Sequence, residues 1–415
     1  MSQKNLCFRL LALLLAAFFF SPSACARSRE EVREHYSALF RESGSLYDEE
    51  PVLSPPYKPG NLSSPCLQEA LGQLNFLRYL AGLQPVTLSD VYGMYAQHGA
   101  VLLAANDRAE HDAPMAQGMS EDFYRTAHTG SMRSNVACLN WTTPSVLAEA
   151  VVCFVMDEGE ENLALLGHRR WILNPRMAET GFGLARSSSG YNYALMYAVD
   201  ETAPEEPWEC IPWPGQGAFP AEYMNPDTPW CIVFNPEIYD LAASSITVAL
   251  TETVSGASFR FDLSEHAPDG FSVLSTEAYG AGPCVIFRPN LVSAGLEDYV
   301  QNQRWQVRVE GLTRADGRSA FLEYETQMIS LTAIDPVAVE ISPRSADLAS
   351  GDVVALQAQV VPAYADDISV TWKTSDASVA TVLSDGVVTA VGAGTCEITA
   401  ESVNGRRDVC TITVK

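Results

Sequence analysis

The chain has 415 residues, of which 51 are acidic and 26 basic, and its formal net charge is −25. This length allows roughly two to four domains, and the hydrophobic content of 47% is ordinary for globular proteins, which excludes wholesale disorder. A nucleic-acid-binding protein needs a basic face to displace counterions, so a surface this acidic argues against one. The same charge argues against electrostatic docking on anionic lipid.

The N-terminus has the three parts of a secretory signal peptide. Lys4 and Arg9 are basic, residues 10–20 form an uninterrupted apolar run, and Ala24-Cys25-Ala26 is a small-x-small cleavage site. The apolar run is too short for a bilayer, which takes about 20 residues, and no other stretch approaches that length. We therefore predict that residues 1–26 are removed on export and that the protein is secreted or associated with the cell surface. Lipidation of Cys25 is the alternative.

Export changes the interpretation of the cysteines. Disulfides form in an oxidising compartment, but eight cysteines remain after the signal peptide and allow 105 pairings, so the connectivity cannot be deduced. Buried, unpaired thiols acting as small hydrophobes are the equal alternative. The spacing does not suggest a structural zinc site. The eight are Cys66, Cys138, Cys153, Cys210, Cys231, Cys284, Cys396 and Cys410.

Composition divides the mature chain into a lead-in and three domains. Residues 27–61 are charged and then proline-rich, which predicts an extended lead-in with one short helix. Residues 62–205 contain three stretches with helical apolar spacing, followed by a two-strand pattern around a Ser-Ser-Ser-Gly turn. This combination predicts an α+β or layered α/β domain. The three helical stretches begin near Ser64, Ser89 and Ser145.

The remaining residues alternate in the manner of β-strands. Residues 206–335 open with a Pro-, Gly- and Trp-rich segment, either a linker or an ordered aromatic loop, and continue as short alternating runs. These runs predict an antiparallel β-sandwich. Residues 336–415 repeat the pattern more regularly and predict an immunoglobulin-like sandwich with Trp372 as its core aromatic residue.

Two runs in the last domain carry a family resemblance. They are Val370-Thr-Trp-Lys-Thr-Ser-Asp-Ala-Ser-Val-Ala-Thr-Val and Asp385-Gly-Val-Val-Thr-Ala-Val-Gly-Ala-Gly-Thr. These runs resemble the group 2 bacterial immunoglobulin-like domain. The resemblance implies a bacterial, exported or surface protein in which this domain is a spacer or an adhesion module without chemistry of its own.

Four motifs follow one another between residues 67 and 200. They are LNFLR at 74–78, His111, GHRRWILNP at 167–175 and TGFGL at 180–184. In this order they resemble the CAP superfamily, the fold of cysteine-rich secretory proteins, antigen 5 and plant pathogenesis-related proteins. The resemblance implies an α-β-α sandwich with a surface cleft. In many members that cleft presents two histidines and two acids, and some members bind divalent metal.

The resemblance assigns positions of this chain to the cleft. His111 and His168 match the two histidines, and Asp157, or Glu158 if the alignment shifts by one residue, matches the acid that precedes GHR. The second acid belongs to a Gly-Glu-Asn motif, but here Ser134 stands before Asn135, so the set of four is incomplete. Arg169 directly follows the second histidine.

The candidate residues permit metal chemistry without requiring it. Two neutral imidazoles and a carboxylate can hold zinc, with water as the fourth ligand, and such a water can attack a carbonyl. The spacing of His111, His168 and Asp157 has no HExxH-type signature, so only the fold can assemble this site. The alternative is that both histidines form hydrogen bonds that hold the cleft together. Serine nucleophile elbows, papain-like cysteine motifs, GxGxxG and P-loop sequences are missing from the sequence.

The sequence therefore favours a non-enzymatic protein that needs no cofactor and binds an extracellular ligand. That ligand is a protein, a glycan or an apolar small molecule. A metal-dependent, peptidase-like hydrolase acting in the cleft is the alternative.

Overall fold

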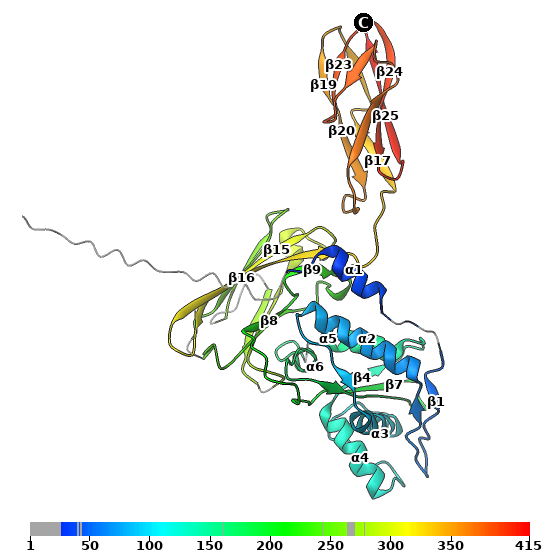
Figure 1. Ribbon diagram of the computed structural model, residues 1–415, viewed down its shortest axis with the longest axis vertical. Coiled ribbons are helices and arrows are strands. Elements are labelled where there is room, and N and C mark those ends of the chain that lie inside the picture. Colours follow the sequence, from blue (N-terminus) through cyan, green and yellow to red (C-terminus); the bar gives the residue numbers. More distant parts are fainter. Residues whose placement is uncertain are drawn as a thin grey trace, which may run out of the picture.

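The protein is seen here as a computed structural model, with elements labelled in Figure 1. The predicted multidomain architecture is confirmed in its outline: helices, several antiparallel sheets and an immunoglobulin-like C-terminal domain. Among the described residues, no helix is long and apolar enough to span a membrane. The predicted signal peptide and Cys25 lie outside the described residues, apart from Ala26. The structure describes residues 26–39, 41, 44–160, 162–242, 244–263, 270–277 and 279–415.

The first folded region places a small sheet between two layers of helices (Figure 1). Helices α2 and α5 cover one face, and α3 contacts β6 and β7 on the other while packing on α4. The helices are α2 (Ser64–Leu80), α3 (Asp90–Asn106), α4 (Glu121–Arg133), α5 (Val146–Met156) and α6 (Gly167–Ile172). The sheet has the order β4-β7-β6, with β4 (Ser134–Leu139), β6 (Phe182–Arg186) and β7 (Asn192–Tyr197); a short pair, β3 (Thr87–Leu88) and β5 (Glu179–Thr180), lies apart.

The glycines of the TGFGL motif explain how closely α3 lies on this sheet. A Cβ atom at Gly183 would be 2.1 Å from the carbonyl oxygen of Ala96, and one at Gly181 would be 2.1 Å from the backbone nitrogen of Gly93. Real Cβ atoms do not approach other atoms so closely, so any side chain here would push the helix away. The motif is therefore a packing requirement of the α3–β6 contact.

The second region contains two sheets that face each other through aromatic rings. The ring centroids of Trp230 and Trp305 are 5.9 Å apart, and those of Phe261 and Phe287 are 5.4 Å apart. The pairings are antiparallel as predicted, except that β9 pairs with β16 in parallel. One sheet has the order β13-β14-β10-β8, with β8 (Cys210–Trp213), β10 (Trp230–Phe234), β13 (Gly270–Ser275) and β14 (Cys284–Pro289). The other has the order β12-β11-β15-β16-β9, with β9 (Gly217–Pro220), β11 (Thr247–Glu252), β12 (Ser258–Asp262), β15 (Arg304–Thr313) and β16 (Ser319–Ile329).

The first two regions share one hydrophobic core. One cluster of buried apolar side chains runs from Val32 to Leu331 and joins α2, α5 and α6 to both sheets of the second region. A separate cluster lies where α3 and α4 pack on the β4-β7-β6 sheet. Trp213, in the segment that the sequence predicted to be a linker or an aromatic loop, is fully buried on β8. We call residues 62–331 the body, because its two parts bury their apolar surface against each other.

Residues 336–415, called the arm below, have a separate core and project from the body (Figure 1). This core is mainly aliphatic, and Trp372, predicted at its centre, is only half-buried at its edge because β21 is the edge strand of its sheet. One sheet is β18-β25-β24-β21, with β18 (Ser345–Leu348), β21 (Val370–Thr374), β24 (Gly394–Ser402) and β25 (Arg407–Val414). The others are β19-β23-β22, with β19 (Val353–Ala355), β22 (Ala380–Val382) and β23 (Val387–Ala390), and β17-β20, with β17 (Ala338–Ser342) and β20 (Gln357–Val361).

The lead-in is more ordered than an extended segment. It contains α1 (Arg29–Ser37), which starts at a capping box formed by Ser28 and Glu31, and the pair β1 (Tyr47–Glu49) and β2 (Asn61–Leu62). The ring of His35 in α1 stacks on that of Tyr79 in α2, with centroids 3.9 Å apart. Val32, also in α1, is fully buried. The helix is thereby fixed to α2.

The eight cysteines are all free thiols in the structure. Five are buried, which matches the alternative in which they act as small hydrophobes; Cys138 is exposed. Cys396 and Cys410 lie on the neighbouring strands β24 and β25, and both are buried in the core of the arm.

Candidate functional site

A buried carboxylate holds one of the two predicted histidines. Asp157 caps the C-terminus of α5 in a left-handed conformation, with φ of 52°, and its side chain is inaccessible to solvent. Its Oδ1 is 2.9 Å from Nδ1 of His168, in the first turn of α6, and its Oδ2 accepts the backbone N–H of Arg169 at 3.3 Å. A carboxylate can only accept here, so Nδ1 carries the proton and Nε2 of neutral His168 keeps a free lone pair. The His168 side chain is 24% exposed.

The second predicted histidine is fixed in the same way by a backbone carbonyl. Nδ1 of His111 lies 2.8 Å from the carbonyl oxygen of Ser131, and the Ser131 hydroxyl donates back to the His111 carbonyl at 2.7 Å. The carbonyl is an acceptor, so Nδ1 again holds the proton and Nε2 is left free. His111 itself is exposed.

One segment connects both histidines. The carbonyl oxygen of Ser131 accepts the hydrogen bond from His111. Four residues further on, Asn135 donates from Nδ2 to the carbonyl oxygen of His168 at 3.0 Å. Between them, Ser134 occupies the position where the resemblance expects an acid. Its hydroxyl is buried and has no hydrogen-bond partner among the described residues.

This geometry makes Asp157 an orienting residue for His168. Histidines that bind metal usually donate their other ring nitrogen to a carboxylate or a carbonyl, which is what Asp157 and the Ser131 carbonyl provide. Each histidine is thus hydrogen-bonded through Nδ1 as metal-ligating histidines usually are. Catalytic zinc sites have three protein ligands, and among the described residues no group of three or more His, Cys, Asp or Glu side chains is placed to hold an ion. Metal binding at His111, His168 and Asp157 stays a prediction.

Loops of the second region reach this end of the body. The Thr228 hydroxyl donates to Glu158 at 2.9 Å, and Asn225 donates to the same carboxylate. Arg288 pairs with Glu160 at 3.2 Å. Glu158 and Glu160 therefore connect the second region to the segment that directly follows Asp157. No sequence signal links them, since the partners are 67 to 128 residues apart.

The arginines of GHRRWILNP point into the core. Arg169 is fully buried and donates to the carbonyl oxygens of Val155, Met156 and Pro229, and to the Cys231 sulfur at 3.7 Å. Burial alone would raise the pKa of Cys231, but hydrogen bonds from Cys284 and Arg169, with the arginine charge, lower it to about 7. Arg169, which sequence reasoning placed beside the cleft, therefore joins the two regions.

Arg170 makes the same kind of connection at the next position. It is fully buried, and it donates to the carbonyl oxygens of Glu277 and Gly282 at 2.6 and 2.7 Å and to the Ser275 hydroxyl at 2.9 Å. Burial lowers the pKa of Arg170. Both arginines donate mainly to backbone carbonyls of the second region, of the last turn of α5 and of the loop before α6, while Nε of Arg170 is buried without a partner among the described residues.

Solved structures give partial likenesses. An enterohaemorrhagic Escherichia coli (EHEC) O157:H7 intimin mutant is 21% identical over 18% of this chain and 45% of its own, with a TM-score of 0.16. The N-terminal part of the bacterial S-layer protein SbsC is 10% identical over 45% of this chain and 41% of its own, with a TM-score of 0.19. The chain thus spans less than half of these structures. Among curated proteins, none matches this chain.

Family profiles match two segments of the chain. Residues 71–199 match the cysteine-rich secretory protein family, CAP, and residues 337–412 match the group 2 bacterial Ig-like domain. These segments coincide with the regions whose motifs carried the two resemblances. The chain therefore combines a CAP domain of the cysteine-rich secretory protein family with a C-terminal bacterial Ig-like domain of group 2.

Proposed function

We propose that this protein is exported by a bacterium and binds a ligand outside the cell without catalysing a reaction, with the arm as its adhesive module. The observation that carries the proposal is the set of hydrogen bonds and ion pairs that attach the arm to α1 and to the body. A passive tether needs only a flexible linker, whereas this arm is held by a network of half-buried charges. We call Arg29, Arg33, Gln301 and Asp366 the clasp.

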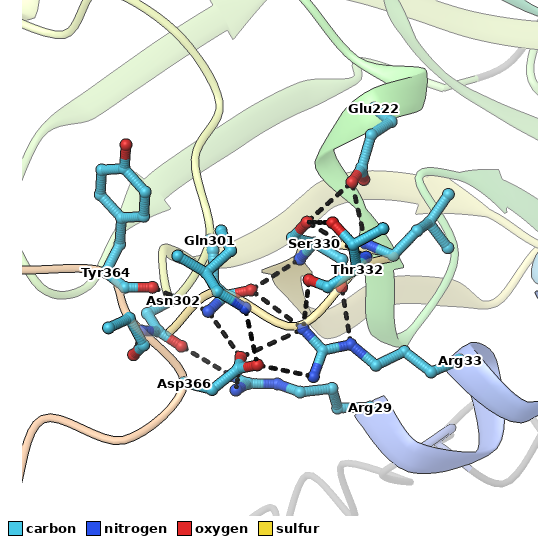
Figure 2. Close-up of polar contacts among 12 residues, drawn as sticks. Arg29, Arg33, Glu222, Gln301, Asn302, Ser330, Thr332, Tyr364 and Asp366 are labelled. Atoms are coloured by element: carbon cyan, nitrogen blue, oxygen red, sulfur yellow. Dashed lines mark hydrogen bonds and ion pairs between the residues drawn. The ribbon is translucent and has the colours of Figure 1, made fainter. Parts of the chain in front are cut away.

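The clasp joins α1, the body and the arm at one carboxylate (Figure 2). Arg29 and Arg33 each place Nη1 2.9 Å from an oxygen of Asp366 in the arm, and Gln301 of the body donates to it at 2.7 Å. The side chains of the three ionic residues are only 18–23% exposed. Ion pairs with this degree of burial are screened less by salt than surface pairs. The arm is thereby presented in one direction.

The charge of the chain limits the ligand. With a net charge of −25, the protein repels anionic surfaces over about a Debye length, roughly 8 Å at physiological salt. We therefore infer a neutral or cationic ligand.

An array of neutral, anionic and cationic oligosaccharides and peptides tests the proposal. Residues 27–415 are expected to bind neutral or cationic spots, and residues 27–335, which lack the arm, are expected to lose that binding. Equal binding by both chains, or binding by neither, would overturn the adhesive role of the arm.

Neutralising Asp366 is expected to free the arm. In Asp366→Asn the two arginines lose their anionic partner, so the radius of gyration measured by small-angle X-ray scattering should rise. The control is Asp367→Asn, since the neighbouring Asp367 is exposed and, among the described residues, forms a side-chain hydrogen bond only with Ser369. An unchanged radius in Asp366→Asn would show that the clasp does not fix the arm.

The clasp also predicts a dependence on pH. Burial alone would raise the pKa of Asp366, but hydrogen bonds from Arg33 and the Ile334 backbone, with the Arg33 charge, hold it below its ordinary value of 3.8. A lowered pKa in the folded state means that the clasp contributes stability above about pH 4, which is lost as the pH falls through the folded pKa. We expect scattering curves to be unchanged from pH 8 to pH 5 and to show a freed arm only under stronger acid.

The Asp157–His168 pair favours one alternative function, a metal-dependent hydrolase. Such an enzyme would bind zinc stoichiometrically and hydrolyse members of a peptide library, and His111→Ala and His168→Ala would each abolish both properties. His128→Ala is the matched control, because His128 pairs with exposed Asp112. Zinc binding with turnover that only the first two variants lose would replace the binding proposal with this alternative.

A further inference from the structure

The arm contains a groove of about 610 Å³ at the open side of its two layers. Strand β21 has the burial pattern of a core strand, in which Val370, Trp372 and Thr374 face inward, but all three remain only half-buried. The reason lies in the topology. Strand β21 is the edge strand of its sheet, and β17 and β20 pair with each other rather than with β21, so the groove lies between these two edges and is lined by residues of both.

Trp372 lines the groove in a fixed position. The turn before β23 brings Gly386 onto its ring, where a Cβ atom would lie 3.0 Å from Cζ2 of the indole. Gly386 has φ of +85°, and its carbonyl accepts the backbone N–H of Leu356 at 3.0 Å, which anchors the turn. Within the described residues the Trp372 indole N–H has no hydrogen-bond partner, whereas those of Trp230 and Trp305, in the core of the body, donate to Tyr299 and Gln303.

Polar side chains surround this aromatic surface. Glu340, Gln357 and Gln359 line the groove and form no side-chain hydrogen bond with other described residues. Arg344 and Asp385 also line it; Arg344 pairs with Asp408 at 3.2 Å, and Asp385 accepts the backbone N–H of Val387 at 3.1 Å. One basic and two acidic side chains leave the groove with little net charge. It therefore suits an uncharged ligand with many hydroxyl groups.

We propose that this groove is a binding site for a neutral oligosaccharide. A pyranose ring has an apolar face that can stack on an indole, while its hydroxyls both donate and accept hydrogen bonds. Carboxylates accept from hydroxyls, and the glutamine amides do both, so Glu340, Gln357 and Gln359 supply complementary partners at the edge of the aromatic surface. The volume is in the range of small-ligand sites. This inference rests on the proposed function and names the ligand class of the arm.

The test uses isothermal titration calorimetry of residues 27–415 with chitotetraose, cellotetraose and mannotetraose. We expect at least one of these neutral tetrasaccharides to bind, and Trp372→Ala to weaken binding by about tenfold or more through the lost stacking. Trp372→Phe keeps an aromatic face and should retain most of the affinity. Trp141→Ala is the matched control, because Trp141 is 39% exposed on the body.

A second variant separates loss of binding from loss of folding. Gln357→Ala and Gln359→Ala change exposed side chains, so they should leave the melting temperature of the arm unchanged. Each should weaken the binding of the same tetrasaccharide. Binding that Trp372→Ala leaves intact, or no heat with any tetrasaccharide, would overturn the proposal. If peptides on the array bind through the arm while no sugar does, the adhesive role stands and only the saccharide assignment fails.

Discussion

Arg169→Ala is expected to unfold the body or to destabilise it by about 3–5 kcal/mol, the range found when a buried charged network loses one member. The substitution removes the donors that satisfy the buried carbonyls of Val155 and Pro229. Each unsatisfied group costs about 1–3 kcal/mol. A cavity between the two regions adds to that loss. The free energy of unfolding, measured by urea titration with tryptophan fluorescence, checks this.

Two controls show that geometry as well as charge is responsible. Arg169→Lys should be nearly as damaging, since an ammonium group cannot reproduce the fork of donors that a guanidinium places on several carbonyls. Arg176→Ala should change little, because Arg176 pairs with Glu205, whose side chain is 85% exposed. A stable, folded Arg169→Ala protein would show that the arginine does not hold the two regions together.

Cutting the chain between the first and second of its three sequence-defined domains is expected to have the largest effect. Residues 27–205 alone should not fold, because the shared core needs the second region, including fully buried Trp213 and Trp230. Without it, the donors of Arg169 and Arg170 also lose their partners on Pro229, Glu277 and Gly282. Residues 27–335 should fold, because the arm has its own core.

Calorimetry and circular dichroism of the two truncated chains measure this difference. Residues 27–335 should show a cooperative transition near that of the body in the full chain, and residues 27–205 should show none. A cooperative transition in residues 27–205 would mean that the CAP domain folds independently and that the shared core is an interface between two domains that each fold alone.

Sequence patterns predicted the elements whose burial is periodic. Helices α2, α3 and α5 have an apolar face and were predicted, as was the β6–β7 hairpin, which pairs antiparallel. Helix α4 was missed because EDFYRTAHTGSMR has few apolar residues and buries only Ala127, Gly130 and Ser131. Its stability comes from close contact with α3, where a Cβ atom at Gly130 would lie 1.9 Å from the Tyr95 carbonyl. The helix is nevertheless amphipathic, and its start signals, the N-cap Ser120 followed by the acidic Glu121 and Asp122, could have revealed it.

The site was only partly visible in the sequence. The family resemblance assigned His111, His168 and Asp157 to the cleft, and the structure shows the hydrogen bond that joins the last two. Spacing could not show that Arg169 faces the second region, because its acceptor on Pro229 lies 60 residues away. The clasp was invisible for the same reason, as 333 residues separate Arg33 and Asp366.

The claim that the arm is held in one direction can be measured directly as a distance. Cys138 of the body is the exposed cysteine among those described, and Ser350→Cys adds an exposed site on the arm. With spin labels at both, double electron–electron resonance at neutral pH should give one narrow distance distribution, which Asp366→Asn broadens. A broad distribution in the otherwise unaltered chain, or one that Asp366→Asn leaves unchanged, would contradict the claim.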